Sequence, residues 1–280
     1  MDALPPETHI GAVHLSVTNL TGTSAFYRDV LGFRGGERDG AMRLSASGEP
    51  PHDLVLHPAP AGAARLRTAG LYHVAILLPS RAHLAQGLRR LIDAGAPIEG
   101  ASDHAVSEAV YLHDPEGNGI EIYADRSRDR WPVRGGSLEM TTKALDLEDL
   151  FRSATGRWQG MPPGTRIGHI HLRVNDLARA EEFYAGILGF EVMLRGYPGA
   201  LFLAAGGYHH HIGLNTWAGV LPPVDPAGPG LRYFMVQVPD AQAREAAVSR
   251  ARAAGVDRKP ADAGGILLHD PDGIAVVLAT

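Results

Sequence analysis

The sequence predicts an α+β protein built from four copies of a βαβββ module, and three observations support this fold class. Residues 10–33 recur almost unchanged at residues 167–190. Residues 70–123 and residues 231–279 share a second pattern, in which a strand, a Pro and a long helix are followed by more strands. Apolar residues alternate in the expected strands and recur at helical spacing between them.

The first type of module begins with a strand and a helix. The segments HLSV and HLRV alternate as a strand with one buried face does. Asn19 and Asp176 follow these strands, where their side-chain oxygens can accept the free N–H groups of a helix start. Gly32 and Gly189 can end the helix with φ > 0. Further strands are expected at residues 41–47, 53–59, 200–206 and 210–215.

The second type of module ends in a turn with a clear mechanism. Residues 114–117 read Asp-Pro-Glu-Gly and residues 270–273 read Asp-Pro-Asp-Gly. In such a turn the Pro presets φ and the Gly supplies a positive φ. A final strand is expected after each turn. The modules therefore span about 8–60, 70–125, 166–218 and 230–280, and they are numbered 1 to 4 in this order.

Length and repeats together predict two domains of two modules each. The first covers 8–125 and the second 166–280. Residues 126–165 form a linker with one short helix expected in the segment ALDLEDLFRSA.

Composition excludes several classes of function. The net charge is -5, which favours neither a nucleic acid nor an anionic membrane as partner. There is no cysteine, so disulfides, thiolate metal sites and cysteine nucleophiles are ruled out. No signal peptide or membrane-spanning apolar run is visible, so the expected location is cytoplasmic. The unusual feature is a set of 14 histidines, several of them close together.

The module order resembles the vicinal-oxygen-chelate superfamily, which includes glyoxalases, bleomycin-resistance proteins and extradiol dioxygenases. The resemblance covers nearly the whole chain apart from the linker. It implies that the modules pair into two cupped, mixed β-sheets with flanking helices, the glyoxalase/dioxygenase fold. It also implies a family of metal-dependent chemistries, since one fold supports many reactions.

In this superfamily one metal ligand lies on the first strand of a module, seven residues before the Asp or Asn that precedes the helix. In module 3 this position is His169, seven residues before Asp176. Module 1 has Ala12 there, which cannot bind a metal. The matching strand position is His73 in module 2 and Tyr233 in module 4.

The family's other ligand follows the Asp-Pro turn, where module 2 has Glu121 and module 4 has Val277. The resemblance therefore implies one complete set: His73, Glu121 and His169. This set requires a crossed pairing, module 2 with module 3 and module 1 with module 4. The ligand nitrogens of the two histidines should then lie within about 5 Å of each other. The alternative is that His14 joins His73 and Glu121 within the first two modules.

Two neutral imidazoles and one carboxylate form the set typical of non-haem Fe(II) oxygenases. Mn(II) suits the same ligands, and zinc with an open position is compatible with them. Three coordination positions stay open, enough for the two oxygens of a catecholate and for O2.

The extradiol dioxygenases are the branch that the chain resembles most. Their pattern has a His-His segment on the last strand of the module that supplies the first ligand, and here residues 208–211 read Tyr-His-His-His. His211 is the best match for the family's acid–base histidine. Tyr111, ten residues before Glu121, and His104 match further residues that contact substrate and oxygen.

Structural interpretations compete with several of these assignments. His14 and His171 face the same way as the ligand position and either line the cup or stabilise the strand. The histidine run on its own is equally compatible with a polar strand edge. Phe202 and Trp217 are expected in the wall or the core.

The resemblance thus implies an Fe(II)-dependent extradiol dioxygenase, similar to the two-domain catechol 2,3-dioxygenases of aromatic hydrocarbon catabolism. Its partners would be a catechol-like substrate and O2. Two alternatives stay open: a glyoxalase- or isomerase-type metalloenzyme, which would be expected to have a fourth protein ligand, and a non-catalytic binder of the bleomycin-resistance type, which needs no metal triad. The sequence leaves the ring substituents of the substrate open, and it is compatible with both a monomer and a homo-oligomer.

Overall fold

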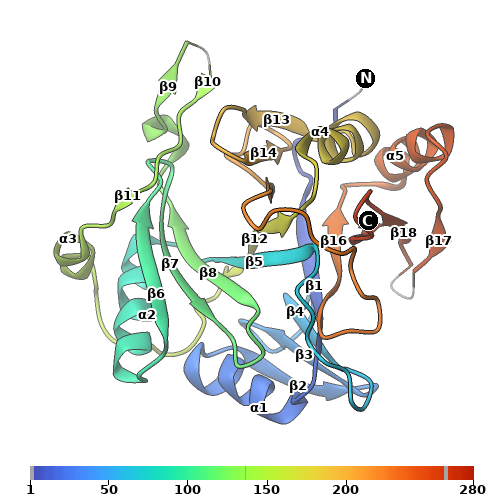
Figure 1. Ribbon diagram of the computed structural model, residues 1–280. Coiled ribbons are helices and arrows are strands. Elements are labelled where there is room, and N and C mark those ends of the chain that lie inside the picture. The colour runs from blue at the N-terminus through green and yellow to red at the C-terminus, as the bar shows by residue number, and fades with distance from the viewer. Residues whose placement is uncertain (1–2, 136, 262–263) are drawn as a thin grey trace.

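The computed structural model describes residues 3–135, 137–261 and 264–280, and it consists of two curled, mixed β-sheets with few helices (Figure 1). All four expected βαβββ modules are present, so the predicted fold class is confirmed. Module 1 contains β1 (His9–Val17), α1 (Leu20–Ala25), the π-helical turn η1 (Phe26–Val30), β2 (Arg34–Arg38), β3 (Ala41–Ser45) and β4 (Leu54–Pro58). Module 2 contains β5 (Gly70–Leu77), α2 (Arg81–Asp93), β6 (Ile98–Asp103), β7 (Ser107–His113) and β8 (Gly119–Asp125).

The second half of the chain repeats this order. Module 3 contains β12 (Arg166–Arg173), α4 (Leu177–Glu181), the π-helical turn η3 (Glu182–Leu188), β13 (Glu191–Leu194), β14 (Ala200–Ala204) and β15 (Ile212–Asn215). Module 4 contains β16 (Gly230–Gln237), α5 (Ala241–Ala253), β17 (Lys259–Pro260), β18 (Ile266–His269) and β19 (Ala275–Ala279).

The strands of the four modules combine in crossed order. The first sheet holds modules 4 and 1, in the order β17-β18-β19-β16-β1-β4-β3-β2. The second sheet holds modules 2 and 3, in the order β11-β6-β7-β8-β5-β12-β15-β14-β13. At the centre of each sheet the first strands of two modules run antiparallel, β1 beside β16 and β5 beside β12. The division of the chain into domains over 8–125 and 166–280 stays a prediction, because strand order does not test those boundaries.

The helix ends follow the local chemistry expected from the sequence. Asn19 accepts a hydrogen bond from the N–H of Gly22 at 2.9 Å, and Asp176 caps α4 in the same way. Gly32 and Gly189 end the two helical segments with φ of 86° and 98°. These residues fix where the helix after each first strand begins and where it ends.

The Asp-Pro turns connect modules that lie in different sheets. Asp114 accepts hydrogen bonds from two N–H groups of its own turn, and its other oxygen accepts one from the hydroxyl of Tyr27 at 3.2 Å. Asp270 accepts one from Tyr184 at 3.1 Å in the second half of the chain. Module 1 is therefore tied to module 2, and module 3 to module 4, although the strands of each pair belong to separate sheets.

The linker contributes elements of its own. It contains the 3-10 turn η2 (Arg128–Arg130), the strand pair β9 (Val133–Arg134) and β10 (Ser137–Leu138), β11 (Lys143–Ala144) and α3 (Leu147–Arg152). α3 lies inside the segment where the short helix was expected. β11 pairs with β6 at the edge of the second sheet, and β9 and β10 project as a hairpin at the top of Figure 1.

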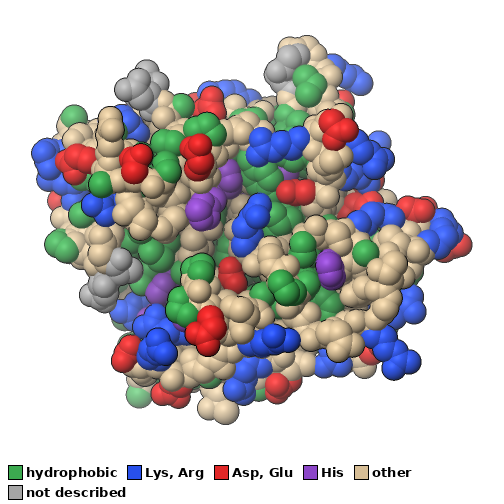
Figure 2. Space-filling view, turned by 180° about the vertical axis from the view of Figure 1, so that it is seen from behind, with side chains coloured by type: hydrophobic (Ala, Val, Ile, Leu, Met, Phe, Trp, Pro, Cys, Tyr) green, Lys and Arg blue, Asp and Glu red, His purple; other side chains and the backbone are tan. Residues whose placement is uncertain are grey.

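The core lies between the sheets and their helices. Leu84, Leu88 and Leu91 of α2 are buried against the second sheet, beside β6 and β7 in Figure 1. A smaller apolar cluster of Ala75, Leu77, Ala109 and Tyr123 lies apart from this core. In the described residues no helix is both long and apolar enough to cross a membrane. On the face shown in Figure 2, acidic and basic side chains are interspersed, in keeping with the net charge of -5.

Candidate metal centre

Three neighbouring strands, β8, β5 and β12, bring the predicted ligands to one face of the second sheet. Ala75 on β5 lies opposite Glu121 of β8 on one side and opposite His169 of β12 on the other. His73 lies two residues before Ala75 and therefore points to the same face. We call this the inner face of the second sheet, the face that carries Ala75, Glu121 and His169.

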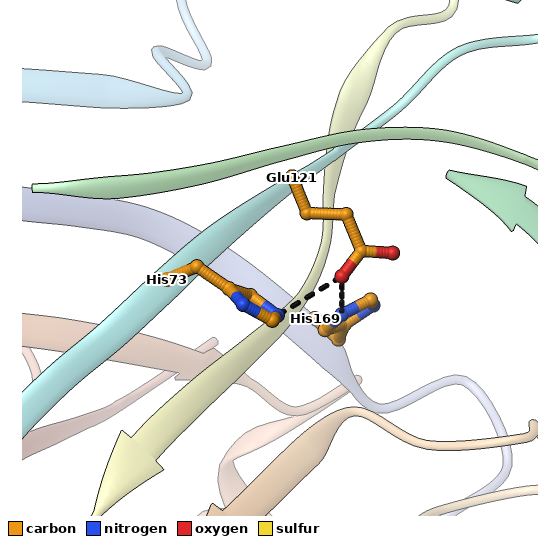
Figure 3. A group of neighbouring side chains, drawn as sticks. All are labelled: His73, Glu121 and His169. Carbon is orange, nitrogen blue, oxygen red and sulfur yellow. Dashed lines mark hydrogen bonds and ion pairs between the residues drawn. The ribbon is translucent and has the colours of Figure 1, made fainter. Parts of the chain in front are cut away.

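The ligand atoms converge over Ala75. One oxygen of Glu121, Oε2, lies 3.0 Å from Nε2 of His73 and 3.2 Å from Nε2 of His169 (Figure 3). The three ligand atoms all lie within 4.8 Å of one another, inside the limit expected for a shared site. The side chains are buried, with 6%, 3% and 1% of the residues His73, Glu121 and His169 exposed.

The protonation of these groups fits a divalent metal. Burial lowers the pKa of both histidines, against the opposing effect of Glu121, so the imidazoles stay neutral at neutral pH. Burial alone would raise the pKa of Glu121, but its interactions with His169 and His73 hold it well below its usual value. Nε2 of His73 is buried, and Oε2 of Glu121, which lies 3.0 Å away, is not well aligned with it as a hydrogen-bond acceptor. A buried polar atom without a well-aligned partner is costly, and a metal bound by these three residues would satisfy it.

A cavity of about 220 Å³ opens beside the ligands. His73 and Glu121 form part of its wall. The other polar groups on the wall include His104, Tyr111, His171 and His210, and the aromatic ones include Tyr72, Tyr197, Phe202 and Trp217. Phe202 and Trp217, expected in the wall or the core, are thus in the wall. The cavity is suited to a flat aromatic molecule that also carries polar groups.

His104 and Tyr111 meet inside this cavity. Tyr111 lies opposite Glu121 in the pairing of β7 with β8, so both side chains share the inner face. Nδ1 of His104 lies 2.7 Å from the carbonyl of Thr141, which can only accept, so this nitrogen carries the proton. Nε2 of a neutral His104 must then accept the hydrogen bond from the Tyr111 hydroxyl at 2.6 Å. Burial, and after it the charge of Glu121, raise the pKa of Tyr111 well above its usual value, so the hydroxyl keeps its proton.

In the run of histidines at residues 209–211, the side chain that reaches the cavity is one residue away from the expected His211. His210, not His211, lines the cavity, and its ring centroid lies 4.0 Å from that of His169. His211 lies in a separate cavity with His9 and Arg166, and its Nδ1 accepts the backbone N–H of Ala205. The structure therefore does not bring His211 together with the metal ligands.

The reason for this difference lies in the backbone. Gly213 lies opposite His171, so strict alternation along β15 would turn residue 211 toward the inner face. The regular strand begins only at Ile212, and residues 208–211 are irregular. Alternation therefore fails for the histidine run, and no pattern in the sequence separates His210 from its neighbour.

The sequence is compatible with two roles for His171, one in the wall of the cavity and one in stabilising its strand. It lines the cavity, and its Nε2 is buried without a hydrogen-bond partner in the described residues. A side chain at Gly213 would place its Cβ 2.9 Å from the ring of His171, so glycine leaves the space that this imidazole occupies.

In the described part of the first sheet there is no equivalent ligand set. Tyr233 pairs with His14 as His73 pairs with His171, and Val277 pairs with Met235 as Glu121 pairs with Ala75. His14 hydrogen-bonds to His57 at 2.9 Å and stacks on Tyr233, so it does not join His73 and Glu121. Among the described residues, His73, Glu121 and His169 form the only group of three or more His, Asp or Glu side chains whose ligand atoms lie close enough together to hold one metal ion.

Comparison with known proteins gives a matching superfamily model and two relatives with similar sequences. The model of the Glyoxalase/Bleomycin resistance protein/Dioxygenase superfamily matches residues 9–122 and 166–278. A catechol-2,3-dioxygenase of Bacillus subtilis is 44% identical over 263 residues, which is 91% of both chains. A biphenyl-2,3-diol 1,2-dioxygenase of Rhodococcus globerulus is 30% identical over 40% of this chain and 60% of its own.

Solved structures share the fold at low identity. A Bacillus subtilis protein described provisionally as a dioxygenase matches with a TM-score of 0.66 and 16% identity, over 99% of this chain and 86% of its own. Glyoxalase I from Zea mays matches with a TM-score of 0.57 and 16% identity, over 97% and 92%. At this identity the likeness concerns the fold alone.

Proposed function

The chain belongs to the glyoxalase/bleomycin resistance protein/dioxygenase superfamily, and from this premise we propose that it is an extradiol dioxygenase that opens catechol-type rings with O2. The observation that carries the proposal is the convergence of His73, Glu121 and His169 at the wall of a cavity lined by aromatic and proton-transferring side chains. The identity with a catechol-2,3-dioxygenase over most of the chain supports the same reaction.

We propose Fe(II) as the ion held by His73, Glu121 and His169. Two neutral imidazoles and one carboxylate are the set used by non-haem Fe(II) oxygenases, and Mn(II) suits the same ligands. When bound, the ion supplies a Lewis acid with open positions for the diol and for O2. The protein ligands carry one negative charge between them, which leaves the ion net positive toward an anionic substrate.

The side chains of the cavity have separate tasks in this proposal. His210 takes a proton from a hydroxyl of the catechol, the role that the sequence had assigned to His211. Tyr111 keeps its proton and can direct it to a substrate oxygen, with His104 holding the hydroxyl in place until substrate enters. Phe202 and Trp217 pack against the ring and exclude water.

The reaction balances within the site. The carbon–carbon bond next to the diol breaks, and both atoms of O2 end in the product as a carbonyl and a carboxylate oxygen. All electrons taken up by O2 come from the substrate, so no separate reductant is required. Protons released by the diol return to the product through the same cavity residues.

Reconstitution with Fe(II) under anaerobic conditions tests this function. Catechol and O2 are then expected to give a yellow ring-fission product, with one mole of O2 consumed per mole of catechol. Glu121→Gln removes the carboxylate charge, and we expect it to lose iron and activity. His14→Asn is the matched control, because His14 lies in the first sheet. Protein that takes up no metal, or metal-loaded protein that leaves catechol intact, would refute the proposal.

A cytoplasmic location stays a prediction from the sequence, which is compatible with both a monomer and a homo-oligomer. The ring substituents that the enzyme accepts depend on the aromatic wall formed by Tyr72, Tyr197, Phe202 and Trp217.

A further inference from the structure

A chain of hydrogen bonds leads from the cavity wall into the protein. Nδ1 of His210 lies 2.8 Å from Nδ1 of His209. Nε2 of His209 lies 2.8 Å from Oδ1 of Asp125, at the end of β8. His209 is 0% exposed, and neither His209 nor Asp125 belongs to the wall of the cavity. Both residues therefore act on the site only through side chains that they touch.

The direction of each hydrogen bond follows from the carboxylate. An ionised Asp125 can only accept, so Nε2 of His209 carries a proton. Nδ1 of a neutral His209 then has a lone pair, and the facing Nδ1 of His210 must donate to it. In a neutral His210 a proton on Nδ1 leaves Nε2 unprotonated.

The carboxylate that sets this order is itself held in place. The hydroxyl of Tyr208 donates to Oδ2 of Asp125 at 2.9 Å, while Oδ1 accepts from His209. The ring of Tyr208 packs on that of His209, with centroids 4.0 Å apart, and its hydroxyl oxygen lies 2.8 Å from that of Tyr123. Asp125 thus has one orientation in which both of its oxygens are used.

We propose that Asp125 and His209 are positioning residues that hold His210 in a single tautomer, with the proton on Nδ1 and the lone pair on Nε2. The lone pair is then available to accept a proton from a molecule in the cavity. The acid–base part of this role rests on the proposed function, whereas the tautomer of His210 does not. A mixture of tautomers would leave part of the protein unable to accept that proton.

The tautomer can be measured directly. The full chain is loaded with Zn(II), which is diamagnetic, and the ring nitrogens of 15N-labelled histidine are observed by NMR. The signals of His210 are identified by their loss in His210→Gln. In the wild type we expect a protonated Nδ1 and an unprotonated Nε2. A wild-type His210 with its proton on Nε2, as a protonated His209 would impose, overturns the proposal.

Two variants interrupt the hydrogen bonds from Asp125 through His209 to His210, and a third variant leaves them in place. Asp125→Asn replaces the obligate acceptor and His209→Phe removes the bridge, so in each the single tautomer of His210 is expected to be lost. Asp176→Asn is the matched control, because it makes the same change at the cap of α4, away from the cavity, where an Asn oxygen can still accept the helix N–H groups. If His209→Phe does not fold, Asp125→Asn and its control decide the question. A wild-type tautomer that persists in Asp125→Asn contradicts the proposal.

Kinetics of the Fe(II)-loaded variants separate positioning from mere stability. We expect kcat to fall at least about ten-fold in Asp125→Asn, because general acid–base catalysis typically contributes more than this. KM for catechol and the iron content are expected to stay unchanged. A shifted tautomer with an unchanged kcat refutes the positioning role. If the wild type has the expected tautomer but no dioxygenase activity, the proposed function fails while the tautomer assignment stands.

Discussion

Ala75 is the residue whose small side chain leaves room for the proposed metal ligands to converge. Glu121 and His169 lie on the two strands that flank β5, roughly 10 Å apart at the backbone because neighbouring strands are spaced by about 4.8 Å. Their side chains nevertheless reach within 3.2 Å of each other. They can do so only by passing above the methyl group of Ala75, which is fully buried beneath them.

Ala75→Val is therefore expected to abolish metal binding while leaving the fold intact. The added methyl groups enter the space between the ligands, and overpacking of this kind costs about 1–3 kcal/mol. Metal content by mass spectrometry and the free energy of unfolding are the measurements. Met235 occupies the equivalent position in the first sheet, so Met235→Leu is the control and should keep the metal. Retention of a full metal complement by Ala75→Val would contradict this geometry.

Tyr111→Phe tests the hydroxyl that bonds to His104. Tyr111 is not a metal ligand, so we expect unchanged iron content and a fall in kcat of roughly 10- to 100-fold, the scale of losing one positioned donor. Steady-state kinetics and iron content measure the two effects. Tyr233→Phe removes a tyrosine hydroxyl from the first sheet and should leave kcat as it is. Loss of iron without a change in the rate per bound iron would mean that Tyr111 supports the metal and not the reaction.

At the level of single residues, sequence and structure agree on which side chains converge where the strands are regular, and they differ where the backbone is irregular. His73, Glu121 and His169 lie on regular strands, so a fixed spacing from the Asp and from the turn could locate them. Tyr111 lies in the cavity for the same reason, since it is in register with Glu121, whereas His104 lies in the connection between β6 and β7. The histidine run precedes the regular part of β15, and there a shift of one residue reverses the direction of the side chain.

Among the elements, the Asp-Pro turns do more than reverse the chain. Asp270 is 6% exposed, yet it accepts hydrogen bonds from two turn N–H groups and from Tyr184. Burial raises the pKa of Asp270 to about 6 in spite of these bonds, which act in the opposite direction. The folded protein therefore holds the proton of Asp270 more tightly than the unfolded chain does.

This difference has a definite sign in the pH dependence of stability. Between the usual pKa of 3.8 and about 6 the folded state binds more protons, so its free energy of unfolding falls as pH rises through this window. Relative to Asp270→Asn, the wild type should lose up to about 3 kcal/mol across the window, since one pKa unit corresponds to about 1.4 kcal/mol. Urea unfolding of both proteins at pH values from 4 to 7 measures the difference. A wild type that gains stability relative to the variant as pH rises would show that Asp270 is stabilised in its charged form.

The elements themselves were predicted to different degrees. Strands and helices that occur twice in the sequence were recognisable, because Asn19 and Asp176 cap the helix starts and Gly32 and Gly189 end the helices. The π-helical turns η1 and η3 were not foreseen, since they differ from an α-helix by one residue per turn and leave the apolar pattern nearly unchanged. The hairpin of β9 and β10 lies in the linker, which has no repeat to compare it with.

At the level of the whole molecule, four related modules build two sheets, but in the described residues a complete set of candidate metal ligands converges only once. The crossed order places β5 beside β12, so His169 reaches His73 and Glu121 from the other half of the chain. Strand propensity alone could not have selected this order, because both pairings satisfy the same alternation. The positions of the candidate ligands did indicate the crossed order, since only modules 2 and 3 together hold a complete set.

The central claim is that modules 2 and 3 jointly form one metal site per chain. Anomalous diffraction at the iron edge from crystals of Fe(II)-loaded protein, grown without oxygen, tests it most directly. We expect a single peak per chain, about 2.0–2.2 Å from Nε2 of His73, Nε2 of His169 and an oxygen of Glu121. A peak beside His14 and His57 in the first sheet, or no peak in protein that turns over catechol, would contradict the claim.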